Sequence, residues 1–278
     1  MYSFLTIMQL TFLEMRRRRI VLAALACGAG CLVIFAAAMY LLQNVHHPLH
    51  AQSLLQIRIV LQLETLAGLY AVNLMTVTVA VMLPVDAISG EIVSGVMQTL
   101  ASKPVRRAEI VLAKWLVYWL MIAAYTTVMV LGVVVSMRLI TGFAQAHVPV
   151  AVGLMILQGT VLLSVVVAGG ARLTTIANGM IAFGFYSVAV VGGWIEQIGV
   201  MMGDSGARYI GTAISLVSPT DALWRRAIYL LQPPVMAQVS MTPFSPASVP
   251  SVAMIWWAAA FAAGALALAA IWFEKRSL

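Results

Sequence analysis

The sequence predicts an all-α membrane protein whose chain crosses the bilayer six times. Of its 278 residues, 63% are hydrophobic and 9% are charged, whereas a soluble domain carries roughly 45–50% apolar and about 25% charged residues. Apolar stretches of about twenty residues, the length of a helix that crosses a bilayer, recur along the chain. Lipid tolerates this much apolar surface, and a chain in lipid must satisfy its backbone internally. The composition therefore excludes a soluble globular fold.

Six stretches have the length and composition of spanning helices. Each is nearly free of Asp, Glu, Lys and Arg, and a charged residue lies at or near at least one of its ends. Glu196 is the exception, and because it lies near the end of its stretch we interpret it as an interfacial residue that reaches water at low cost. The predicted spans are 20–42, 65–85, 115–137, 150–171, 176–198 and 252–273.

The basic residues predict the orientation of these spans. Lys and Arg accumulate in the cytoplasmic loops of membrane proteins. With the N-terminus inside, the cytoplasmic segments hold 11 of the 16 basic residues and the outer segments hold 5. We therefore expect both termini in the cytoplasm of a bacterial-type cell membrane. Because the net charge of +7 is explained by these flanks, and no basic stripe contains interleaved aromatic residues, nucleic acid is not an expected partner.

A further helix is predicted before the first span, over residues 1–19. Its apolar residues follow helical spacing, and four arginines, 16–19, come directly after them. Such a helix places its apolar face in the membrane surface and its arginines against anionic lipid headgroups. The residues of the predicted apolar stripe are Phe4, Leu5, Met8, Phe12 and Met15.

The predicted extracytoplasmic segment, 199–251, contains a short amphipathic helix. Ser218 is a candidate N-cap, Pro219 suits the first turn, and Asp221 has the position of a capping-box acid. We expect the helix to lie on the outer membrane surface or to cover the bundle. Its predicted apolar face carries Leu223, Ala227, Leu230 and Leu231, and Arg225, Arg226 and Tyr229 are predicted to lie away from that face.

No cofactor, metal site or catalytic centre is predicted in this chain. Cys27 and Cys31 share one face of the first span, where they act as small packing residues. Three histidines, 46, 47 and 50, have no nearby carboxylate or thiol to complete a metal site, and we interpret them as loop residues. The chain contains no P-loop, H-E-x-x-H, G-x-S-x-G or C-x-x-C pattern. We therefore expect no enzyme activity from it.

The predicted cytoplasmic loop, 86–114, is patterned more strongly than a solvated connection needs to be. Its first part predicts a short helix with Ile92, Val96 and Leu100 on one face, and Pro104 breaks the pattern. A second helical stretch then leads into the third span. Apolar stripes on a cytoplasmic loop indicate a surface that docks onto a soluble partner.

In this loop the sequence resembles the permeases of type-2 ABC exporters. Their signature is an acidic residue, a Gly-Thr-Leu-like step, a Lys/Ser-Pro-Val step, an Arg, and a Lys before the third span. Val96 and Ala113 depart from the Thr and the Gly that are usual in the family. The matching residues here are Ser89-Gly90-Glu91, Ser94-Gly95, Lys103-Pro104-Val105, Arg107 and Lys114.

The resemblance implies a membrane permease that works with a separate ATP-binding subunit. It implies a homodimer or heterodimer of six-helix subunits in the lipid membrane, with ATP bound by the partner subunit. The loop would be a coupling helix that docks on this ATPase. The implied docking residues are Glu91, Gly95, Val96, Thr99 and Leu100, and the implied residues that hold the loop in place are Pro104, Arg107 and Lys114.

Two other functions are compatible with the same arrangement of spans and loops. One is the permease of an ABC complex that transmits ATP energy for cofactor maturation or motility with little bulk transport. The other is a plain membrane anchor or membrane enzyme, which the patterned loop and the missing catalytic motifs disfavour.

Overall fold

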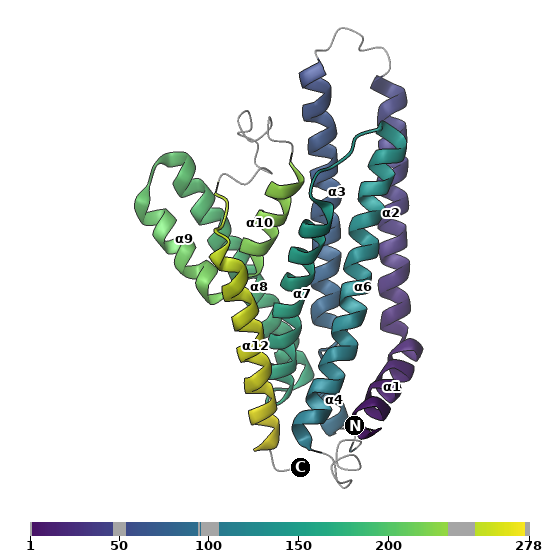
Figure 1. Cartoon of the computed structure of the whole chain (residues 1–278), viewed down its shortest axis with the longest axis vertical. Coiled ribbons are helices and arrows are strands. Elements are labelled where there is room, and N and C mark those ends of the chain that lie inside the picture. Colours follow the sequence, from purple (N-terminus) through teal and green to yellow (C-terminus); the bar gives the residue numbers. More distant parts are fainter. Residues whose placement is uncertain (1, 47–53, 94, 96–105, 233–247, 276–278) are drawn as a thin grey trace.

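The computed structural model describes residues 2–46, 54–93, 95, 106–232 and 248–275. Within these ranges the regular elements are all helices (Figure 1), and six of them are long and apolar enough to cross a membrane. The prediction of an all-α chain with six helices that could span a membrane is therefore confirmed for the described residues. The six long helices are α2 (Arg19–His46), α3 (Leu54–Met82), α6 (Arg107–Thr141), α7 (Val148–Gly170), α8 (Thr175–Met202) and α12 (Ala253–Glu274).

Several of these helices extend well beyond the predicted spans. Helix α3 begins at Leu54 rather than at residue 65, and α6 begins at Arg107 rather than at residue 115. Apolar composition identifies only the part of a helix that lies in hydrocarbon, because charged residues are rare in that part. The backbone hydrogen-bond ladder can continue into the headgroup layer and the water, so Lys114 lies inside α6 instead of preceding it.

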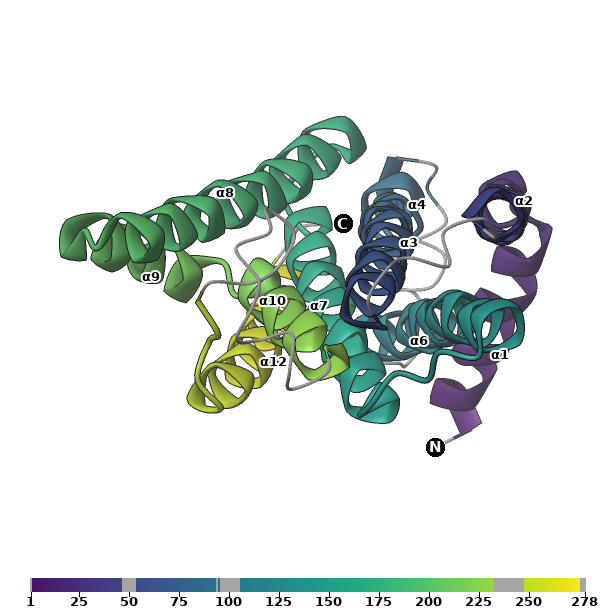
Figure 2. The same cartoon turned by 90° about the horizontal axis from the view of Figure 1, so that it is seen from above.

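Helix α7 forms the centre of the bundle. It contacts α3 and α6 on one side and α8, α10 and α12 on the other, an arrangement that Figure 2 shows from above. Its sequence is almost entirely apolar, with Gln158, Thr160 and Ser164 as its polar side chains, as is typical of a helix with neighbours on every side. Helix α2 lies at the periphery and packs on α3 and α6.

Glycines bring α2 close to both of its neighbours. A Cβ atom on Gly68 of α3 would lie 2.5 Å from the Phe35 ring, and one on Gly132 of α6 would lie 2.6 Å from the Leu32 side chain. Small residues of this kind allow membrane helices to approach closely, where van der Waals packing replaces the hydrophobic effect. Phe35 and Leu32 therefore fit into the spaces that these glycines leave.

Polar side chains connect the spans inside the bundle. Trp119 Nε1 of α6 donates a hydrogen bond to Thr160 Oγ1 of α7 at 2.9 Å, and Trp115 Nε1 donates to Ser164 Oγ at 3.1 Å. Asn73 Nδ2 of α3 donates to the Tyr186 hydroxyl of α8 at 3.1 Å. Such bonds stabilise helix association because lipid offers these groups no alternative partner.

Helix α1 (Tyr2–Arg17) precedes the first span and packs on α6 and α2. Ile7, Thr11 and Met15 are buried, whereas Leu5 and Phe12 are 50% and 49% exposed. The predicted stripe is therefore divided between a face that packs on the bundle and a face that does not. The interfacial position of α1 stays a prediction. Helix α1 lies at the same end of the molecule as α4 and the last turn of α12 (Figure 1), and we call this the α1 end.

The segment after α8 differs most from expectation. Gly203, at φ 71°, ends α8, and an unpredicted helix, α9 (Ser205–Val217), returns along α8. The predicted amphipathic helix exists as α10 (Thr220–Leu231) and packs mainly on α7. Ser218 is not its cap: it ends α9 and donates a hydrogen bond to the Phe185 carbonyl at 3.0 Å.

The prediction that Arg225 lies away from the apolar face of α10 is wrong. Its side chain is only 2% exposed, and it is among the largest fully buried side chains of the described residues. The reason is that two carboxylates surround its guanidinium, one of them from α8. A pattern that is read along one helix does not contain partners from another.

Helix α9 lies close enough to α8 to test this packing with one methyl group. A Cβ atom on Gly192 would lie 2.3 Å from Ile214 Cγ2 and 2.6 Å from its Cβ, so Gly192→Ala forces the two helices apart. We expect a loss of about 1–3 kcal/mol, the usual cost of overpacking. Thermal unfolding of the purified protein in detergent measures it. Gly184→Ala is the matched control on α8, because nothing lies within 4 Å of its Cβ position. Equal unfolding temperatures for the two variants would contradict the packing described here.

Candidate functional site

The candidate site is the connection between α3 and α6, where the sequence predicts a docking loop. Helix α3 ends at Met82 because Pro84 restricts the residue before it and has no N–H to donate. A turn follows, in which Ala87 N donates to the Pro84 carbonyl at 3.0 Å. One short helical turn, α4 (Ser89–Val93), completes the described part. We refer to residues 83–93 as the connecting segment.

A buried ion pair fastens the connecting segment to α6. Lys114 Nζ contacts Glu91 Oε1 and also donates a hydrogen bond to the Ala87 carbonyl at 3.2 Å. Lys114 and Glu91 are 3% and 8% exposed. A buried charge is tolerated when it has both an opposite charge and further hydrogen bonds, and the Ala87 carbonyl provides such a bond. Glu91 and Lys114, both predicted as site residues, are therefore in contact.

A second set of charges joins the connecting segment to the junction of α1 and α2. Arg18 lies between these helices and contacts Glu14 and Asp86, each at 2.5 Å. Burial alone would lower the pKa of Arg18, but its hydrogen bonds and charge interactions with Glu14 and Asp86, together with Tyr118, raise it above the ordinary value. Arg18 stays charged, and it connects the amphipathic α1 to the segment.

Helices α7 and α8 hold the other side of the segment through neutral groups. Ser89 Oγ lies 2.8 Å from Thr175 Oγ1 at the start of α8. Asn178 Nδ2 donates to the Val85 carbonyl at 3.3 Å and to the Val166 carbonyl of α7 at 2.9 Å. The Asn178 amide fits because its neighbour on α7 is Gly169: a Cβ atom there would lie 2.1 Å from Asn178 Oδ1. Asn178 thus joins the segment, α7 and α8.

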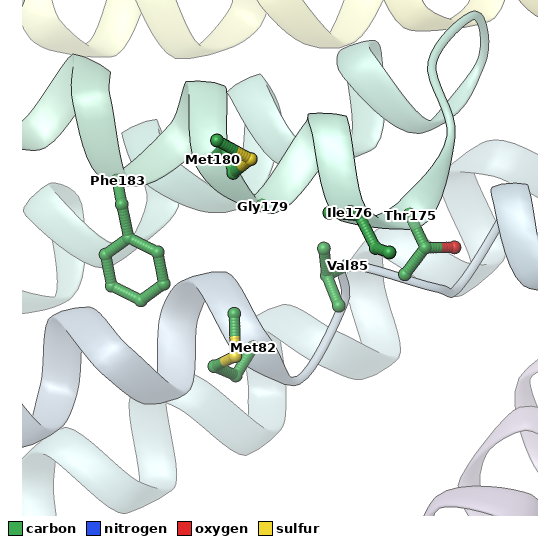
Figure 3. Close-up of a pocket in the computed structure, with 7 residues that line it drawn as sticks. All are labelled: Met82, Val85, Thr175, Ile176, Gly179, Met180 and Phe183. Atoms are coloured by element: carbon green, nitrogen blue, oxygen red, sulfur yellow. The ribbon is translucent and has the colours of Figure 1, made fainter.

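An apolar groove of about 590 Å³ lies beside these contacts, between the end of α3 and the start of α8. Figure 3 shows Met82 and Val85 on one side and residues of α8 on the other. Val85 and Thr175 belong to the groove and also bind Asn178 and Ser89. A displacement of the connecting segment must therefore change the shape of the groove. Its lining residues are Met82, Val85, Thr175, Ile176, Gly179, Met180 and Phe183.

The other predicted site residues have different surroundings. Arg107 donates to the Glu274 carbonyl at the end of α12, at 3.4 Å, where a cation is favourable for the helix dipole. Gly95 follows α4 and has φ 77°, a conformation that suits glycine. Its N–H donates a hydrogen bond to the Ile92 carbonyl of α4. Val93 beside it is 86% exposed. Four residues of the prediction, Val96, Thr99, Leu100 and Pro104, lie outside the described residues.

The charge cluster around Arg225 was missed by the sequence prediction. Arg225 Nη2 lies 2.9 Å from Glu196 Oε2 of α8, and its Nε lies 2.9 Å from Asp221 Oδ2. Glu196 is therefore a buried, ion-paired residue, its interfacial depth stays a prediction, and Asp221 pairs with Arg225 instead of capping a helix. Two signals could have indicated this: the i,i+4 spacing of Asp221 and Arg225, and the rule that acids in spans have partners.

Comparison with known proteins assigns this chain to no family. No protein-family model matches the sequence, and no curated protein matches it. Across the part of the chain that the structure describes, no group of three or more His, Cys, Asp or Glu side chains is arranged to hold a metal ion. A functional assignment therefore depends on the motif in the loop and on the contacts of the connecting segment.

The ion pair between Glu91 and Lys114 can be tested by a double-mutant cycle. Lys114→Met removes the ammonium partner of a buried carboxylate, and we expect a loss of about 3–5 kcal/mol. Replacing both residues, as Lys114→Met with Glu91→Met, removes the buried charges together and should recover most of that loss. Thermal unfolding in detergent of the wild type, both single variants and the double variant measures the coupling. Additive losses would show that the two side chains do not stabilise each other.

Proposed function

We propose that this chain is the transmembrane permease subunit of an ABC exporter, driven by a separate ATP-binding subunit that docks at the α1 end. The observation that carries the proposal is the attachment of the connecting segment. It is bonded to α6 by Lys114, to the α1–α2 junction by Arg18, and to α7 and α8 by Asn178. Motion that a docked partner imposes on the segment would therefore reach most of the bundle.

The strength of these contacts supports transmission of such motion. Separating Lys114 from Glu91 would leave two buried charges without each other, at a cost of roughly 3–5 kcal/mol. A partner that pulls or turns the segment would more easily move α6 with it than break this pair. The neutral bonds of Asn178 and Ser89 extend the same argument to α7 and α8.

The docking surface that we propose begins at the exposed end of α4. Val93 is 86% exposed, and an isolated apolar side chain beside a glycine turn suits a groove on a soluble partner. In the family that the sequence resembles, the residues that follow, Val96, Thr99 and Leu100, would complete this surface. ATP would be bound and hydrolysed by the partner, since this chain has no P-loop pattern.

The proposal also includes a second permease subunit, identical or related, in a bacterial-type cell membrane. With the N-terminus in the cytoplasm, the whole α1 end faces the cytoplasm, in agreement with the bias of basic residues toward the predicted inner segments. The groove between α3 and α8 would change shape with the connecting segment. This change would couple ATP binding outside the bundle to a surface within it.

The proposed docking is tested by coexpression with a candidate ABC ATP-binding subunit. Val93→Asp places a charge where an apolar contact is expected, so copurification and permease-stimulated ATP hydrolysis should fall by about tenfold or more. Met202→Asp is the matched control. Met202 is 78% exposed and is the last residue of α8, at the end of that helix away from the connecting segment. Undiminished assembly and ATP hydrolysis with Val93→Asp, and with replacements of Glu91 and Gly95, would contradict the proposal.

A further inference from the structure

The Arg225 cluster contains more acid than base, and all of its charges are buried. The guanidinium of Arg225 lies between the carboxylates of Glu196 and Asp221, with side-chain exposures of 2%, 11% and 7%. We infer that this cluster is a proton-binding site, in which the two carboxyls share one arginine and one of them takes up a proton that tightens the packing of α9 and α10 on α8. The inference does not depend on the ATPase partner.

The cluster connects several elements of the structure at once. Arg225 Nη2 also lies 3.4 Å from Ser215 Oγ of α9, and Nη1 lies 3.5 Å from the Ser248 carbonyl. Ser248, which precedes α12, in turn donates to the second oxygen of Glu196. One arginine thus joins α8, α9, α10 and the chain that enters α12. Any change in its charge balance acts on all four.

The charges of the cluster do not balance. With every group ionised the cluster carries one surplus negative charge in a buried place. An uncompensated buried ion is costly, and a carboxyl avoids that cost by keeping its proton. Two carboxylates at one site commonly share a proton for this reason.

No other described group supplies the missing positive charge. The titratable side chains that interact with Asp221 from other elements are Tyr70 of α3 and Tyr186 of α8, both neutral at ordinary pH, besides Glu196 itself. Helix α7, against which α10 packs, has no titratable residue. On α9, Arg208 is exposed, and Arg226 of α10 donates to the Pro250 carbonyl instead.

Asp221 lies very close to the backbone of α8. A Cβ atom on Gly193 would lie 1.8 Å from Asp221 Oδ2, so this carboxyl lies directly against the α8 backbone. Burial raises the pKa of Asp221 to about 6, against the attraction of Arg225, which lowers it, and with a further increase from Glu196. Its carboxyl is therefore protonated in the packed state at a pH where a solvated aspartate has ionised.

The sign of the pH dependence follows from this difference. Between the ordinary value of 3.8 and about 6, the packed state holds a proton that the unpacked state has released. The extra stability of the packed state is thus present at the acidic end of this window and is lost as the pH rises through about 6. An acidic pH on the side of the membrane where α8 turns into α9 would therefore keep α9 and α10 packed on α8.

The experiment measures thermal unfolding in detergent from pH 4.5 to pH 8 for the wild type and for Asp221→Asn. We expect the unfolding temperature of the wild type to fall by roughly 3–8 °C between pH 5 and pH 7, and the Asp221→Asn profile to lack this fall. Asp204→Asn is the matched control, because Asp204 is an exposed acid on the neighbouring turn, and its profile should follow the wild type. A profile that Asp221→Asn does not change would overturn the inference.

A second readout applies if Asp221→Asn does not fold. Glu196→Gln also removes the surplus negative charge, so it should shift the fall in unfolding temperature to lower pH. Infrared difference spectra of the wild type between pH 5 and pH 7 should contain a protonated-carboxyl band, and Glu196→Gln should shift its titration in the same direction. Absence of the band in the wild type, or a titration unmoved by Glu196→Gln, would exclude proton binding by this pair.

Discussion

Buried Lys114 of α6 holds the connecting segment in place, and the coupling of this segment to the rest of the bundle depends on that contact. Lys114 contacts Glu91 and bonds the Ala87 carbonyl in surroundings almost without solvent. In such surroundings the pair is costly to separate, so the connecting segment and α6 move together. Arg18 and Asn178 extend this attachment to the other helices at the same end. Without the lysine, the segment would be held on two sides instead of three.

Two clusters of ion-paired side chains hold helices together in the described part of the chain. At the α1 end, Lys114 and Arg18 neutralise acids of the connecting segment. In the other half of the molecule, Arg225 draws α8 and α10 together and reaches Ser215 of α9. Between them the helices pack through apolar side chains, glycine contacts and a few neutral hydrogen bonds. Because isolated charges are so costly in lipid, these two clusters are the places where the bundle differs from generic packing.

The sequence alone predicts the spans well and the charge clusters poorly, for one physical reason. Apolar length is a local property, so six spans follow from composition, although their polar ends do not. Helix α9 was missed because its mixed composition places it neither among spans nor among polar loops. The loop motif identified Glu91 and Lys114, which are 23 residues apart, as site residues. That they meet, and that Arg225 meets Glu196 across 29 residues, depends on helix packing that no local pattern contains.

Chemical labelling of position 93 tests whether the connecting segment receives a cytoplasmic ATPase. In a protein with Cys27→Ser and Cys31→Ser, a Val93→Cys substitution gives one reactive thiol at the exposed end of α4. If the segment docks a cytoplasmic ATPase, a membrane-impermeant maleimide should leave intact cells unlabelled, should label inside-out vesicles that lack the ATPase, and should fail to label them when the ATPase is bound. Labelling of intact cells, or equal labelling with and without the ATPase, would contradict this docking.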